Sequence, residues 1–148
     1  MSATPPRPVP AERWEHFPHV ADMGVRGFGS TLDEAFAAAA HAMTAVITDP
    51  DAVRPEIRVE IHAQAADPEI LLYDFLNGLV YEMAVNGLLF SRFRVRSEGD
   101  RLLAEAWGEK TDVARHQPCV EVKGATFTQL DVRREDDGRW LAQCVLDI

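Results

Sequence analysis

Within one short stretch of this chain, the hydrophobic period changes from two residues to about 3.6, and this change limits the possible folds most strongly. Residues 56–64 alternate between apolar and polar side chains, as a half-buried strand does. Asp67-Pro68 then supplies a helix N-cap and a first helical residue. The helix ends at Asn86-Gly87. Its buried stripe is predicted to be Leu72, Leu76, Leu79, Val80 and Met83.

A second helix is predicted upstream of this one. Thr31-x-x-Glu34 is a capping box, in which the hydroxyl and the carboxylate satisfy free backbone N–H groups reciprocally. Apolar residues follow at helical spacing, and the helix should end near Asp49-Pro50. Before it we expect a short apolar segment at residues 14–20, a turn at residues 22–24 and a short strand at residues 25–28.

The second half of the chain is predicted to be β structure. Residues 88–96 and 102–108 form a hairpin around a turn at residues 98–100. A strand is expected over residues 119–132, with Gly124 as a bulge. A turn at residues 136–138 leads into a last strand, residues 139–148.

These elements predict an α+β protein in which two helices pack on a mostly antiparallel β-sheet. We expect residues 13–148 to form a single compact domain. Residues 1–12 contain four prolines and no periodic pattern, so we expect a flexible proline-rich tail.

The charge of the chain excludes some partners. It has 15 basic and 24 acidic residues, a net charge of −9, which is unsuited to strong direct binding of nucleic acid. No apolar stretch is long enough to span a bilayer, and the N-terminus lacks the apolar region of a signal peptide. Cys119 and Cys144 form no CxxC pattern, so we expect free thiols and a cytoplasmic protein.

Two motifs have a simpler interpretation than a binding site. Gly27-Phe28-Gly29 stands where a dinucleotide loop would, but Leu32 replaces the third glycine, which favours a turn that leads into the capped helix. Arg92, Arg94 and Arg96 line one strand face, which we interpret as solvated rather than phosphate-binding.

Three sets of residues are candidates for chemistry. Asp112 and His116 could pair for acid–base or metal work, although a turn between strands is simpler. His19 and Asp22 could serve as ligands, or Asp22 could form an Asx-turn. Asp147, beside the terminal carboxylate, makes a hard-oxygen cation site plausible if a third carboxylate joins; the alternative is a frayed terminus.

Taken in order, several segments over residues 13–148 resemble the archease family. The N-terminal signature is residues 19–29, followed by residues 31–36. Further matching segments are residues 71–77, residues 87–90, Gly108-Glu109-Lys110 with Asp112 and His116, residues 122–126, and the final residues 146–148.

The resemblance implies a small α+β protein that is not itself an enzyme. Such proteins act as cofactors of an RtcB-type RNA ligase in tRNA splicing or RNA repair. The ligase is guanylylated on a histidine with GTP and divalent metal, and archeases accelerate this step and support multiple turnover. The resemblance also implies a divalent cation, calcium or another metal such as Mn²⁺, held by Asp22, Asp147 and Ile148. Lys123 matches a lysine implied in activation.

Two departures from the family pattern affect these expectations. Val20 replaces a threonine, which would remove a hydrogen bond to Asp22, and Thr128 stands where the family often has a histidine. Two alternatives stay open. One is a small metal-dependent phosphoesterase with His19 or His116 as the general base. The other is a metal-independent protein adaptor in which Asp22 and Asp147 are structural.

Overall fold

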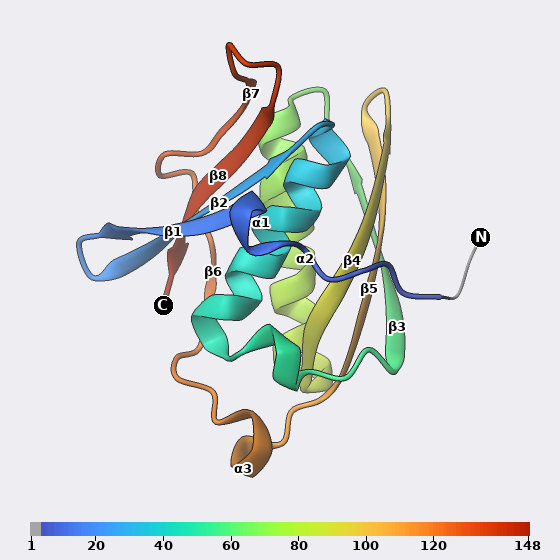
Figure 1. Ribbon diagram of the computed structural model, residues 1–148, viewed down its shortest axis with the longest axis vertical. Coiled ribbons are helices and arrows are strands. Elements are labelled where there is room, and N and C mark those ends of the chain that lie inside the picture. Colours follow the sequence, from blue (N-terminus) through green and yellow to red (C-terminus); the bar gives the residue numbers. More distant parts are fainter. Residues whose placement is uncertain (1–3) are drawn as a thin grey trace.

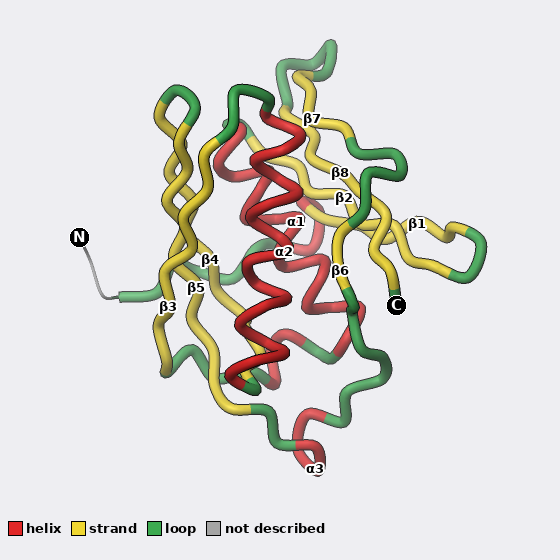
Figure 2. The backbone as a smooth tube through the Cα atoms, turned by 180° about the vertical axis from the view of Figure 1, so that it is seen from behind, coloured by secondary structure: helices red, strands yellow, loops and turns green. Residues whose placement is uncertain are grey.

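The computed structural model describes residues 4–148, which form two antiparallel sheets with two long helices between them (Figures 1 and 2). The helices are α1 (Leu32–Ile47) and α2 (Pro68–Asn86). The predicted α+β class, with two main helices and antiparallel strands in one compact domain, is confirmed. The sequence did not indicate that the strands divide into two sheets. One sheet covers each face of the helix layer.

The larger sheet has five strands and contains both ends of the folded domain. Its order is β1-β2-β8-β6, and β7 pairs with β8 on the same side as β6. The strands are β1 (Trp14–His19), β2 (Asp22–Gly29), β6 (Gly124–Ala125), β7 (Asp131–Arg134) and β8 (Trp140–Asp147). We call it the five-stranded sheet.

The smaller sheet has the order β3-β5-β4, with all neighbours antiparallel. Its strands are β3 (Ile57–Gln64), β4 (Leu88–Glu98) and β5 (Arg101–Lys110). Gly99, with φ of +62°, turns β4 into β5, a conformation that glycine adopts without steric penalty. The hairpin and the alternating strand predicted from the sequence are both confirmed.

Both predicted helices begin and end close to their signals. The Thr31 hydroxyl accepts the Glu34 N–H at 3.1 Å, and the Asp67 carboxylate accepts the Glu69 N–H at 2.9 Å. Gly87 ends α2 in the left-handed conformation. The caps therefore fix where the chain leaves each sheet.

Helix α1 is buried almost all round, because it lies between the two sheets. Its central residues, 35–40, are mostly alanine, and all of them are buried. A Cβ on Gly27 would lie 2.2 Å from the backbone nitrogen of Ala39. Gly27 therefore serves close packing of β2 against α1, which supports the packing interpretation of Gly27-Phe28-Gly29 over a nucleotide loop.

The strand predicted over residues 119–132 is wrong in extent. Of these residues, only 124–125 and 131–132 pair with β8. The six residue steps from Ala125 to Asp131 lie opposite three steps of β8, from Leu146 to Gln143. The residues between them bulge out of the ladder, and Gln129 takes a positive φ of 51°. The interruption lies after Gly124, not at it.

Two turn predictions also need correction. Residue Asp22 is not in a turn but opens β2, because the chain reverses at Val20-Ala21, where Ala21 has φ of +60°. Residues between β5 and β6 are not a plain loop: α3 (Val113–His116) is a single helical turn, and the Asp112 carboxylate accepts the Arg115 N–H at 3.2 Å. Two short 3₁₀ turns, Ala11–Arg13 and Pro50–Ala52, complete the fold.

Residues 1–3 of the predicted tail lie outside the described residues. Residues 4–10 run across β4 before the turn at Ala11–Arg13 (Figure 1). Within the described part of the chain, no helix is long and apolar enough to cross a membrane.

Candidate functional site

Three of the predicted site residues come together at one end of the five-stranded sheet. His19 pairs with Asp22 across the β1–β2 hairpin. The last recorded pair between β2 and β8 is Met23 with Leu146, so Asp22 and Asp147 are the next residue on each strand. We call His19, Asp22 and Asp147 the sheet-end row.

The members of this row share the face of the sheet that points away from the helices. Gly27 faces α1, so alternation along β2 turns Asp22 to the opposite face. Residues directly opposite each other in antiparallel strands share a face, which places His19 and Asp147 on the same side. The row therefore lies on the outer side of the sheet, away from the helix layer.

Lys123 lies beside the row. Its backbone N–H donates to the Asp147 carbonyl at 2.8 Å, directly before β6, and its side chain is exposed. The adjoining Gly124 pairs with Asp147. The resemblance named Asp147 and Lys123 separately, and the β6–β8 pairing makes them neighbours.

The sequence analysis missed the residue that positions β6. The Asn77 amide, from the middle of α2, accepts the Ala125 N–H at 2.9 Å and donates to the Ala125 carbonyl at 3.4 Å. A two-residue strand has few bonds of its own, so this clamp sets where Lys123 leaves the sheet. The available signal was a polar amide in a largely apolar helical segment.

A hollow of about 570 Å³ opens on the other side of Lys123. It lies between α2 and residues 118–123, and apolar side chains such as Val80, Met83 and Val122 line it. Nothing in the sequence pattern predicted it, because its two walls are about 40 residues apart in the chain. Lys123 thus stands between a carboxylate row and an apolar hollow.

The donor set of the row suits a hard divalent cation. Asp22 and Asp147 offer carboxylate oxygens, the ligands that calcium and Mn²⁺ prefer, and Ile148 follows Asp147 directly. His19 Nδ1 is buried and has no hydrogen-bond partner among the described residues. Residues 4–148 contain no assembled group of three or more His, Cys, Asp or Glu side chains that could hold a metal. The fit is therefore one of donor chemistry and strand placement.

The two departures from the family pattern are both at the surface. Val20 lies in the β1–β2 turn beside His19 and is 89% exposed. Thr128 lies in the bulge between β6 and β7, where its carbonyl accepts the Val145 N–H at 3.1 Å. Neither side chain belongs to the buried core, so neither departure changes the packing of the fold.

Asp112 and His116 are not part of the sheet-end row. His116 is buried, and its Nε2 lies 2.9 Å from the Glu109 carboxylate. Its Nδ1 accepts the Asp112 N–H at 2.8 Å, which fixes the neutral ring with its proton on Nε2. Both ring nitrogens are used, so His116 holds α3 against β5.

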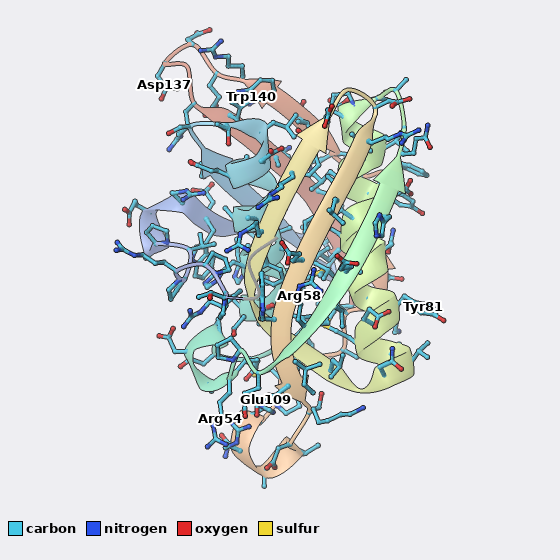
Figure 3. All side chains as sticks on the ribbon, turned by 90° about the vertical axis from the view of Figure 1, so that its right-hand side faces the viewer. Arg54, Arg58, Tyr81, Glu109, Asp137 and Trp140 are labelled. Carbon is cyan, nitrogen blue, oxygen red and sulfur yellow. The ribbon has the colours of Figure 1, made fainter. Side chains whose placement is uncertain are left out.

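Glu109 is the centre of this second cluster (Figure 3). The Arg115 guanidinium bonds to it, burial opposes ionisation less strongly, and Arg54 donates its backbone N–H at 2.7 Å. Chiefly through Arg115, the pKa of Glu109 falls to about 2. The cluster is a structural ion pair that ties residues 112–116 to the end of β5.

Comparison with known proteins gives a family match over residues 14–148, to the archease protein family (MTH1598/TM1083). Protein archease of Pyrococcus furiosus is 42% identical over 140 residues, which cover 92% of this chain and 99% of that protein. Protein archease of Thermococcus gammatolerans is 44% identical over 140 residues, with the same coverage.

Solved structures agree with these matches. The solution structure of Methanobacterium thermoautotrophicum protein 1598 superimposes with a TM-score of 0.81 at 32% identity, covering 93% of this chain and 99% of that one. A crystal structure from Thermotoga maritima, described as an archease and possible chaperone, has a TM-score of 0.60 at 18% identity. It covers 89% of this chain and 94% of its own, and the likeness concerns the fold alone.

Proposed function

This chain belongs to the archease family, and we propose that it is a non-enzymatic protein cofactor of an RtcB-type RNA ligase. It promotes guanylylation of the ligase by GTP in tRNA splicing or RNA repair, in the cytoplasm. The observation that carries this proposal is the placement of His19, Asp22 and Asp147 at neighbouring strand positions, with Lys123 beside them, at one end of the five-stranded sheet.

Asp22, Asp147 and the Ile148 carboxylate would hold the divalent cation, calcium or Mn²⁺. The bound cation supplies positive charge at a solvent-facing edge where the chain otherwise presents carboxylates. His19 lies opposite Asp22 in the β1–β2 hairpin. The Lys123 ammonium adds a mobile positive group beside the row and reaches outward towards a partner's anionic ligand.

The overall charge favours a protein partner over RNA. A net charge of −9 repels a phosphate backbone and attracts a basic, RNA-binding protein. Association with the ligase should therefore weaken as the ionic strength rises. In this proposal the cofactor binds the ligase, and the ligase alone binds the RNA.

The test is single-turnover guanylylation of a purified RtcB-type ligase with labelled GTP, at limiting Mn²⁺, with and without this protein. We expect faster labelling and more than one ligation cycle per ligase molecule when the protein is present. Unchanged labelling of a cognate ligase, by a protein shown to be folded, would contradict the proposal.

The same experiment separates the two alternatives. A phosphoesterase would release phosphate from a generic phosphoester without any ligase, so the isolated protein is assayed alongside. A metal-independent adaptor would bind the ligase equally well in chelator. The proposed cofactor shows no turnover alone, and its effect on the ligase, measured with metal present, disappears in the Asp22→Ala and Asp147→Ala variants.

A further inference from the structure

The outer face of the three-stranded sheet is not an ordinary solvated face. Ala104 and Ala106 turn towards the helices, so alternation along β5 sends Glu105 and Trp107 outward. Yet Glu105 is 1% exposed and Trp107 is 2% exposed. Figure 3 looks onto this face, with Arg58 labelled on it. Something covers an aromatic ring and a carboxylate that the two-sheet fold leaves outside the core.

Part of the cover is a set of arginines. Arg58 donates to Glu105 at 2.6 Å, and Arg94 lies 3.5 Å from the same carboxylate. The Arg94 guanidinium also stacks 5.2 Å from the centre of the Trp107 ring. The contacts with Glu105 and Trp107 hold the Arg94 fork in a fixed orientation on the sheet.

Residues 4–10 bind to arginines of the same row. Arg92 donates to the Pro6 carbonyl at 3.0 Å, and Arg94 donates to the Thr4 carbonyl at 2.9 Å. The donors are two residues apart on β4, and the acceptors are two residues apart on the segment, in the opposite order. The segment crosses β4 (Figure 1), and arginine side chains rather than a backbone ladder supply the donors.

Proline explains why side chains rather than the backbone make these bonds. Residues 4–10 contain four prolines, which lack the N–H needed to extend a sheet but hold an extended backbone with exposed carbonyls. The segment is anchored at its base, where Arg13 donates to the carbonyls of Phe28 and Glu34, both at 3.0 Å. Between this anchor and the bonds to Arg92 and Arg94, the segment covers a hollow of about 410 Å³, and Phe93 and Val95 lie among the residues that line it.

This segment is an addition to the domain. The family match begins at residue 14, and the two Pyrococcus and Thermococcus relatives align over 99% and 99% of their own lengths but 92% of this chain. The described apolar core begins at Trp14. Residues 4–10 therefore bind to a fold that is complete without them.

We propose that the β4 edge is a binding site for an extended, proline-containing peptide segment, and that residues 4–10 of this chain occupy it in cis. Arg92 and Arg94 bind alternate carbonyls, and Phe93 and Val95 lie in the floor of the hollow beneath the segment. Carbonyl recognition beside an aromatic and apolar floor is the chemistry by which polyproline segments are bound. A partner's segment of this chemistry reaches the edge only by displacing residues 4–10.

Tethering sets the affinity that this proposal requires. The short connection to the domain gives residues 4–10 an effective concentration on the order of 1 mM at their site. Because the segment is bound to its own chain, the same segment as a separate peptide must bind with a Kd below about 1 mM. Loss of one hydrogen bond between an arginine side chain and a peptide carbonyl should weaken peptide binding about tenfold or more.

The first experiment uses the full chain with its segment released. In this variant, glycine replaces Pro5, Pro6, Pro8 and Pro10. A labelled peptide of residues 4–12 is titrated by fluorescence anisotropy. We expect a Kd of about 0.1–1 mM for the variant and at least tenfold weaker binding to the wild-type protein, whose own segment fills the site.

Matched variants test the arginine contacts. Arg92→Gln in the released background should weaken peptide binding at least tenfold, whereas Arg96→Gln, the next arginine on the same face, should leave it unchanged. In the otherwise wild-type chain, ¹⁵N relaxation of Arg7 and Val9 should show restricted motion that Arg92→Gln abolishes. This second readout does not depend on the glycine variant.

Several results would overturn the proposal. No saturable binding by a folded released variant below about 1 mM would do so, as would equal binding by the Arg92→Gln and Arg96→Gln variants. Dimerisation of the wild-type chain through exchange of residues 4–10 would contradict occupation in cis.

Discussion

Asn77 and Ala125 are joined by two hydrogen bonds, one to the backbone N–H and one to the carbonyl of the alanine. One amide in the middle of α2 thus replaces a neighbouring strand for β6 on its open side. The adjoining residues, Gly124 and Lys123, bond to Asp147 on β8. The helix layer therefore fixes the place of the lysine proposed to act on the ligase.

Replacing Asn77 with leucine should uncouple β6 from α2. Two backbone groups lose their partner in a half-buried site, so the free energy of unfolding should fall by about 1–3 kcal/mol. Urea denaturation measures this change. Asn86→Leu, at the exposed end of the same helix, should stay within about 0.5 kcal/mol of wild type.

The Asn77 variant should also lose more ligase activation than its lost stability explains. At a temperature where both variants are folded, Asn77→Leu should slow guanylylation while Asn86→Leu does not. Equal activation by the two would mean that the position of Lys123 is unimportant.

The Glu109 cluster predicts an acid-sensitive stability. The folded-state pKa of Glu109 is about 2, chiefly through the Arg115 hydrogen bond, against 4.5 ordinarily. A depressed carboxyl pKa contributes stability above about pH 4.5 that is lost as the pH falls towards 2. Glu109→Gln should therefore lower stability at pH 7, by about 1–3 kcal/mol, with a difference that shrinks across this window. Thermal unfolding from pH 2.5 to 7 measures it, and a constant difference would contradict the assignment.

His41 predicts a second pH effect. It is 5% exposed in α1, and its Nδ1 has no hydrogen-bond partner among residues 4–148. Burial lowers the pKa of His41 below 6.5; Asp51 opposes this shift, and Arg92 adds to it. The unfolded chain binds this proton more readily, so stability falls as the pH drops below about 6.5.

His41→Leu removes this proton-binding difference. The variant should be within about 1 kcal/mol of wild type at pH 7.5 and relatively more stable at pH 5. Denaturant midpoints at the two pH values test this expectation. A His62→Leu variant, exposed on β3, serves as the control and should show no such crossover.

The sheet-end row predicts stabilisation by divalent cations. Calcium at about 100 times its Kd should raise stability by about 2.7 kcal/mol, which is several degrees in Tm for a chain of this size. Asp22→Asn and Asp147→Asn should each abolish the shift. Asp137→Asn, in the turn before β8 at the far end of the same sheet, should retain it (Figure 3).

The helices, the β4–β5 hairpin and the last strand could be predicted because local signals agree with the final structure there. Thr31, Asp67 and Gly87 act on their own neighbours in the chain, and so does the alternation of β3. The prediction of one strand over residues 119–132 was wrong. Apolar content suggests a strand there, whereas pairing with β8 depends on residues far away in the sequence.

The candidate site divides in the same way. Asp22, Asp147 and Lys123 were identified through resemblance alone, and only strand pairing brings them to one sheet end. Asn77 and the apolar hollow depend on contacts between distant segments, which no periodicity encodes. Arg92 and Arg94 were interpreted as a solvated face, because the sequence does not reveal that residues 4–10 bind to them.

The measurement that tests the central claim most directly is guanylylation of a cognate RtcB-type ligase by labelled GTP at limiting Mn²⁺, with three folded variants compared side by side. Asp22→Ala and Asp147→Ala should abolish the acceleration, and Asp137→Ala should retain it. Full acceleration by the Asp22→Ala variant would contradict the account, because the ligase would then be activated without the sheet-end row.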